Sequence, residues 1–72
     1  MSAMSDLATG VREALGRKVA CKVVVHNAVQ AELGKQAAER MAPEVGGDPG
    51  LITFEVVAER ERDLYPVGAI ST

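Results

Sequence analysis

Residues 28–58 read AVQAELGKQAAERMA, PEVGGDPG and LITFEVVA in succession, and this stretch decides the fold. Its first part has the apolar spacing of a helix, and Asn27 is placed to cap the helix start. We therefore expect a helix over residues 28–42. Because Pro43 cannot donate a backbone hydrogen bond, it predicts the end of that helix. The glycines and prolines that follow predict a reversal, and the alternating run predicts a strand over residues 51–58.

The apolar arc of the predicted helix 28–42 is wider than the roughly 100° stripe that a helix needs to cover a single sheet. One edge of the arc carries the larger side chains, and we expect it to face the sheet of the same chain. The adjacent edge carries alanine and glycine, which allows close approach of a second helix. That second helix is either the first helix of this chain or a helix of another copy. The larger edge comprises Val29, Leu33, Ala37 and Met41, and the small edge comprises Ala31, Gly34, Ala38 and Ala42.

Upstream of residue 28 the sequence predicts a helix over residues 5–16 and a strand over residues 19–26. Apolar side chains at helical spacing indicate the helix, and alternation indicates the strand. One face of this strand is apolar, and the other looks half buried. In the strand over residues 51–58, alternation places on the buried face Ile52, Phe54, Val56 and Ala58.

Residues 59–72 do not continue the strand pattern. ERERD at positions 59–63 has no apolar face, and Pro66 restricts the apolar segment after it to an extended tail or a sheet edge. We therefore expect an extended C-terminal arm or an edge strand. The predicted fold class is α+β, with the order α-β-α-β and a possible third strand. Two helices would cover a small sheet of two or three strands.

The length of 72 residues predicts one small domain, which buries a limited fraction of its surface on folding. Domains of this size commonly need a disulfide, a metal or a partner. Cys21 is the one cysteine and His26 the one histidine, so we expect no internal disulfide and no metal site. A partner chain remains, and self-association into a homo-oligomer is the simplest form.

The charges are unevenly distributed along the chain. Residues 1–26 carry four basic and two acidic side chains, whereas residues 27–72 carry four basic and eight acidic ones. Two interpretations remain open. The asymmetry is either scatter among few charges, or complementarity between neighbouring copies arranged head to tail.

Catalytic chemistry is not indicated by the residue pattern. Cys21 and His26 are five positions apart in the predicted strand, so they point to opposite faces and could not share a proton. We expect Cys21 to behave as a small buried hydrophobe and His26 as a solvated or capping residue. The sequence GGDPG at 46–50 precedes a strand instead of a helix, which favours a plain turn over a phosphate-binding loop. We predict no catalytic residue, no cofactor and no enzymatic activity.

The segment 29–70 resembles the tail-component family of long-tailed bacteriophages, which are small head–tail joining or tail-completion proteins. The shared features are an alanine-rich helix ending in Ala-Pro, a glycine-containing turn, an apolar residue opening a strand, and a return to the core. They are carried here by AAERMAP at 37–43, Gly46 and Gly47, Leu51, ITFEVVAERERD at 52–63, and YPVG at 65–68. The resemblance implies a structural protein of the phage neck or tail that works in rings or collars and has no active site.

These observations predict a non-enzymatic assembly protein that contacts copies of itself, for example in a ring, and other proteins of the same assembly. The alternative is a small acidic-surfaced inhibitory or regulatory module that binds a basic protein. We expect no membrane contact, no direct nucleic-acid readout, no signal peptide, and a location in the cytoplasm or a virion. The predicted interface residues are Ala31, Gly34, Ala38, Glu59, Arg60, Glu61, Arg62, Tyr65 and Val67.

Overall fold

The computed structural model describes residues 3–71 and has the α+β fold predicted from the sequence. Within those residues it contains two α-helices, three short β-strands and two 3₁₀ turns. The order along the chain is α1 (Ala3–Arg17), β1 (Cys21–Val25), α2 (Ala28–Val45), η1 (Pro49–Leu51), β2 (Ile52–Val56), η2 (Glu59–Glu61) and β3 (Ile70–Ser71).

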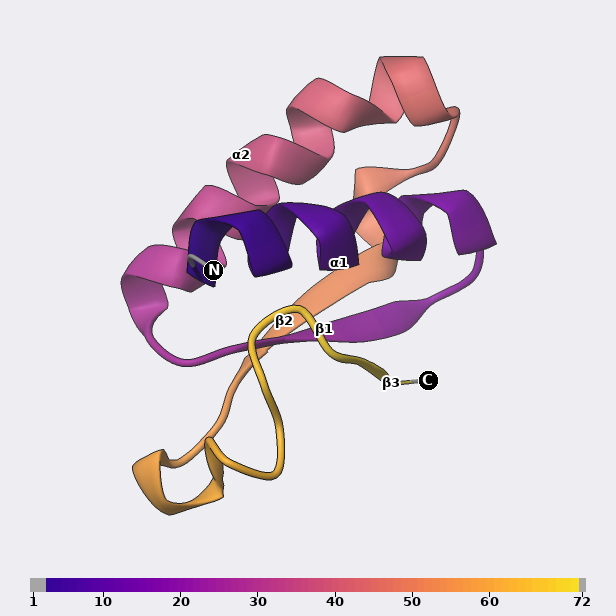
Figure 1. Ribbon diagram of the computed structural model, residues 1–72. Coiled ribbons are helices and arrows are strands. Elements are labelled where there is room, and N and C mark those ends of the chain that lie inside the picture. The colour runs from indigo at the N-terminus through magenta and orange to yellow at the C-terminus, as the bar shows by residue number, and fades with distance from the viewer. Residues whose placement is uncertain (1–2, 72) are drawn as a thin grey trace.

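The strand β1 is the centre of a three-stranded mixed sheet with the order β2-β1-β3. β2 pairs with β1 in parallel, with Cys21 opposite Ile52 and Val25 opposite Val56. β3 pairs with the other side of β1 in the antiparallel sense. In Figure 1 both helices lie on one side of the strands, while η2 projects away from them. The connection from β1 through α2 to β2 is therefore a βαβ unit, with α1 packed beside α2.

The hydrophobic core lies between the two helices and the sheet. α1 supplies a buried stripe at helical spacing, and β1 supplies its helix-facing side chains. α2 and β2 contribute few fully buried side chains to this cluster. The core comprises Leu7, Val11, Ala14, Leu15, Cys21, Val23, Val25, Ala38 and Ile52.

The two helices extend beyond their predicted bounds of 5–16 and 28–42. The prediction that Pro43 ends the second helix is wrong. Proline removes only its own hydrogen bond, and the Gly46 N–H donates to the Ala42 carbonyl at 2.7 Å, which closes one more turn. Gly46, with φ 83°, then ends α2 in the left-handed conformation that glycine adopts readily. α1 is followed by Lys18 in the same region, with φ 57°.

The N-terminus of α2 is capped as the sequence predicts. The Asn27 Oδ1 accepts a hydrogen bond from the Gln30 N–H at 2.8 Å. The Gln30 side chain reaches back one residue further than in a capping box, because its Oε1 accepts from the His26 N–H at 2.7 Å. The start of α2 is thus tied to the end of β1.

The strands are shorter than the predicted ranges 19–26 and 51–58, and the burial predicted for the second of them is partly wrong. Ile52 and Phe54 face the helices, but Val56 is 52% exposed and Ala58 is exposed. Val57 is buried instead. Its N–H donates to the Val25 carbonyl at 3.1 Å, so the chain stays beside β1 while the Val57 side chain turns to the opposite face.

The segment after β2 folds back onto the domain instead of extending from it. The Val24 N–H donates to the Ala69 carbonyl and the Gly68 N–H donates to the Val24 carbonyl, each at 2.9 Å. Gly68 has φ 89° and its backbone lies directly against Gly10 of α1, where an added Cβ would fall 2.7 Å from the Gly68 Cα. Of the two predicted alternatives, an extended arm or an edge strand, the structure has the edge strand β3. Thr72 lies outside the described residues.

Candidate binding site on the open face of the sheet

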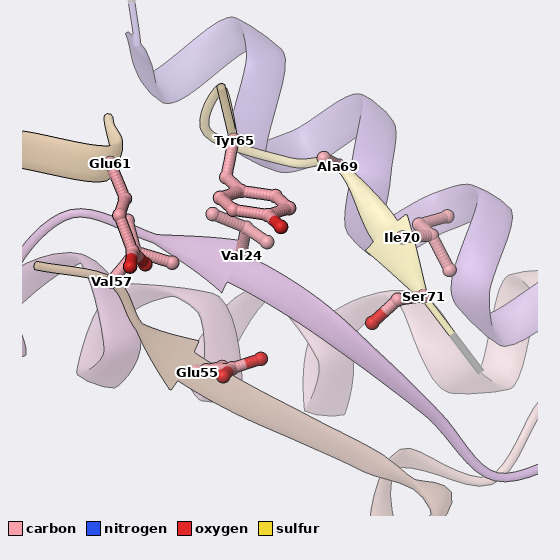
Figure 2. A pocket seen from close by; sticks show the side chains of 8 residues that line it. All are labelled: Val24, Glu55, Val57, Glu61, Tyr65, Ala69, Ile70 and Ser71. Carbon is pink, nitrogen blue, oxygen red and sulfur yellow. The ribbon is translucent and has the colours of Figure 1, made fainter. Parts of the chain in front are cut away.

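A hollow of about 370 Å³ lies on the face of the sheet that the helices leave open. Its walls come from all three strands and from the segment between β2 and β3. Figure 2 shows the Tyr65 ring over Val24 and the Glu61 side chain directed toward Val57. The lining residues are Val24, Glu55, Val57, Glu61, Tyr65, Ala69, Ile70 and Ser71.

Val24 forms the floor of the hollow and is positioned by the pairing of β1. In β1 the side chains of Val23 and Val25 point into the core, so Val24 points to the opposite face. On that face it would be exposed, but residues of the returning segment reduce its exposed fraction to 4%. Tyr65 is itself 47% exposed. The hollow therefore has a buried apolar floor and an aromatic wall that stays accessible to a ligand.

His26 holds the returning segment in place over the hollow. Its Nε2 is 2.8 Å from the Tyr65 carbonyl oxygen, and its own carbonyl accepts from the Arg62 Nη2 at 3.0 Å. These contacts join residues that are 39 and 36 positions apart in the sequence. The sequence analysis expected His26 to be a solvated or capping residue. In the structure its side chain instead links the end of β1 to the C-terminal segment.

Replacing His26 with phenylalanine should lower the free energy of unfolding by about 1 kcal/mol, since the ring volume is kept and one hydrogen bond is lost. Urea denaturation followed by circular dichroism measures the change. Hydrogen exchange at the Gly68 amide should accelerate as well, because the segment that carries it is held less firmly. An unchanged free energy of unfolding, together with unchanged Gly68 exchange, would show that the ring does not hold the segment.

The residues that line the hollow favour binding of a positively charged group. Glu55 and Glu61 contribute carboxylates, and no lysine or arginine is among the residues that line it. Arg60 and Arg62 flank Glu61 in the sequence, and Arg62 is bound to the His26 carbonyl. An aromatic ring beside carboxylates and an apolar floor suits an ammonium or guanidinium group with an alkyl stem, through charge attraction and cation–π contact.

The small residues predicted as an intermolecular interface lie largely inside the protein. Gly34 and Ala38 are the buried residues of α2, and a Cβ on Gly34 would fall 2.5 Å from the Phe54 Cε1. Ala31 packs partly buried against the core. The small edge therefore faces the sheet and core of the same chain. Of the larger edge, Ala37 and Met41 also pack against the core, whereas Val29 is 68% exposed. The interface prediction is wrong for Gly34 and Ala38.

The C-terminal residues predicted as interface fall into three groups. Glu61 and Tyr65 line the hollow. Arg62 is tied to His26, and Val67 packs half-buried against the core. Glu59 and Arg60 belong to η2 and are exposed. Two residues predicted as interface thus line the hollow, whereas its floor, Val24 and Val57, and Glu55 were not singled out from the sequence. The apolar Val24 on the second face of its strand was the signal that something covers it.

Cys21 and His26 are far from forming a nucleophile–base pair. Cys21 is buried at 4% exposure against α1, with its Sγ 3.9 Å from the Ala14 carbonyl oxygen. His26 lies past the other end of β1 and contacts the C-terminal segment. The GGDPG sequence forms the end of α2 and the start of η1, where the Asp48 Oδ1 accepts from the Gly50 N–H at 2.8 Å. It is the turn that was predicted.

Comparison with protein families, with curated proteins and with solved structures finds no match. The likeness to phage tail components therefore stays a prediction from the sequence. Among residues 3–71, no helix is both long and apolar enough to cross a membrane, and no group of three or more His, Cys, Asp or Glu side chains is placed to hold a metal ion.

Proposed function

We propose that this protein is a non-enzymatic assembly protein, whose hollow receives a lysine or arginine side chain from a partner protein. The observation that carries the proposal is the half-exposed Tyr65 ring over the buried floor of Val24, with the carboxylates of Glu55 and Glu61 beside it. A phage neck or tail is the setting that the sequence resemblance suggests for such contacts, between copies and with other proteins of the assembly.

Titration with a blocked arginine peptide, acetyl-Gly-Arg-Gly-amide, tests the hollow directly. We expect it to shift the amide resonances of Val24, Val57 and Ala69 in ¹⁵N-labelled protein, because these residues lie in the floor and walls. A single side chain should bind weakly, with a Kd of about 1 mM. The same peptide with glutamate in place of arginine should leave these resonances unchanged.

Two variants make the titration specific. Glu61→Gln removes a carboxylate from the hollow and should raise the Kd for the arginine peptide about fivefold, since one charge-assisted contact is lost. Glu44→Gln makes the same charge change on the exposed surface of α2, across the sheet from the hollow, and should leave the Kd unchanged. Equal binding of the arginine and glutamate peptides, or equal loss in both variants, would contradict the proposal.

A second function fits the same acidic hollow. The alternative predicted from the sequence, an inhibitory or regulatory module that binds a basic protein, would also use Glu55, Glu61 and Tyr65 to hold a basic side chain. The two functions differ in stoichiometry. Native mass spectrometry of the complex distinguishes them, because an assembly protein is present in several copies and an inhibitor in one copy per partner.

A further inference from the structure

The strand β2 forms an outer edge of the sheet, and no other strand among residues 3–71 pairs with its far side. The Val57 N–H donates to the Val25 carbonyl, so by alternation Thr53 and Glu55 also direct their backbone groups toward β1. Phe54 and Val56 consequently direct their N–H and C=O groups outward. A second chain could hydrogen-bond to this edge without disturbing the existing sheet.

This edge lacks the features that usually prevent pairing with another chain. Edge strands are commonly protected by lysine, proline, a bulge or short length. β2 has neither lysine nor proline, and its five residues pair with β1 in unbroken register. Its sequence ITFEV is also rich in residues that favour strands. The opposite edge, β3, has only two residues. The open edge of β2 is therefore the stronger candidate for an interface.

We propose that β2 pairs with β2 of a second copy, antiparallel across a two-fold axis at Phe54, giving one continuous six-stranded sheet. This inference rests on the proposed assembly function and names one of its partners. In this arrangement the Phe54 N–H of each copy donates to the Phe54 carbonyl of the other. The Val56 N–H donates to the Ile52 carbonyl across the axis. The Ile52 N–H takes no part in this pairing, because it already donates to the Pro49 carbonyl of its own chain.

The side chains of β2 match in this register. Ile52 of one copy lies opposite Val56 of the other on the helix-facing side, so the 52% exposed Val56 gains an apolar neighbour. On the open face Thr53 lies opposite Glu55, which pairs a hydroxyl donor with a carboxylate acceptor. No like charges are opposed. A two-fold interface must be complementary to itself, and this strand satisfies that condition.

The helix α2 runs beside the open edge of β2. A groove beside β2 is lined by Lys35 and Glu39 of α2 and by Phe54, so these charges flank the open edge. Antiparallel pairing of β2 would bring the two α2 helices alongside each other in opposite directions. Lys35 lies between Glu32 and Glu39 on the exposed side of α2, so this side of the helix carries both signs of charge.

Sedimentation velocity over a wide concentration range, with a proline at the open edge, tests the pairing. Val56→Pro removes an outward N–H and should raise the dimer dissociation constant at least about tenfold, while leaving the bonds to β1 in place. Val56→Thr keeps that N–H and a β-branched side chain, and should keep the wild-type dissociation constant to within about threefold. A Val56→Pro protein with native circular dichroism and undiminished self-association would contradict the pairing.

Hydrogen exchange on the unaltered protein gives an answer that does not depend on any variant. The Thr53 and Glu55 amides should be protected at every concentration, because they bond to β1. The Phe54 and Val56 amides should become protected only as concentration rises. Fast exchange at Phe54 and Val56 even at the highest concentration would overturn the proposal. The arginine titration probes the hollow alone and these experiments probe the edge alone, so failure of either proposal is distinguishable from failure of the other.

Discussion

Replacing Gly10 with alanine should lower the free energy of unfolding by about 2–3 kcal/mol, although alanine is the better helix former by about 1 kcal/mol. The new Cβ would overlap the Gly68 carbonyl group, which is backbone and has no rotamer to adopt. α1 and the C-terminal segment would have to separate. A domain of 72 residues has a total stability of roughly 4–10 kcal/mol, so this loss is a large fraction.

Urea denaturation measures the Gly10→Ala effect, and hydrogen exchange locates it. The Val24 amide bonds to the Ala69 carbonyl in the segment that would be displaced, so its protection should fall more than that of the core. Gly16→Ala is the matched control, because a Cβ there meets nothing within 4 Å and should stabilise the helix. An equal gain in stability for Gly10→Ala and Gly16→Ala would contradict the close approach of Gly10 and Gly68.

Replacing Gly34 with leucine should destabilise the fold itself by about 3 kcal/mol. The sequence analysis placed Gly34 in an interface with another molecule, but the structure places it against the Phe54 ring of the same chain. A Cβ on Gly34 would lie 2.5 Å from the Cε1 and 2.9 Å from the Cδ1 of that ring. Leucine adds further atoms in the same direction, so Phe54 must leave its place between α2 and β2.

Thermal and urea unfolding of the Gly34→Leu protein test this expectation, and a second substitution identifies the cause. Adding Phe54→Ala to Gly34→Leu should restore part of the lost stability, because the two side chains compete for one space. Gln36→Leu, on the exposed side of the same helix, should change the free energy of unfolding by less than about 0.5 kcal/mol. Additive effects of Gly34→Leu and Phe54→Ala would show that the ring is not the obstacle.

The helices and strands were predictable because the signals for them are local. Asn27 accepts a hydrogen bond three residues away, and the alternation of β1 is visible within five residues. Their ends were less predictable. Several ways of ending a helix differ little in free energy. α2 ends with the Gly46 hydrogen bond that carries it past Pro43, and α1 is followed by Lys18 in the left-handed conformation. Packing of α1 and α2 onto the sheet makes that choice.

The candidate site was only partly predictable for the same reason. Glu61 and Tyr65 could be singled out from the sequence, because residues 59–72 do not continue the pattern of the predicted strand 51–58. Their companions Val24 and Glu55 come from other strands, and only the register of β1 with β2 brings Glu55 opposite Val24. The position of Tyr65 over Val24 depends further on the link from His26 to the Tyr65 carbonyl, across 39 residues.

The sequence by itself determined the α+β class, the succession of helices and strands, the capped start of α2 and the burial of Cys21. Each follows from spacing and from hydrogen bonds between near neighbours. Only the tertiary structure decided that the small residues of α2 face its own core, that residues 59–71 fold back, and that β2 remains an open edge. These depend on contacts such as Gly10 with Gly68 and Gly34 with Phe54, between residues far apart in the chain. Local residue patterns carry no information about which distant surface each segment will meet.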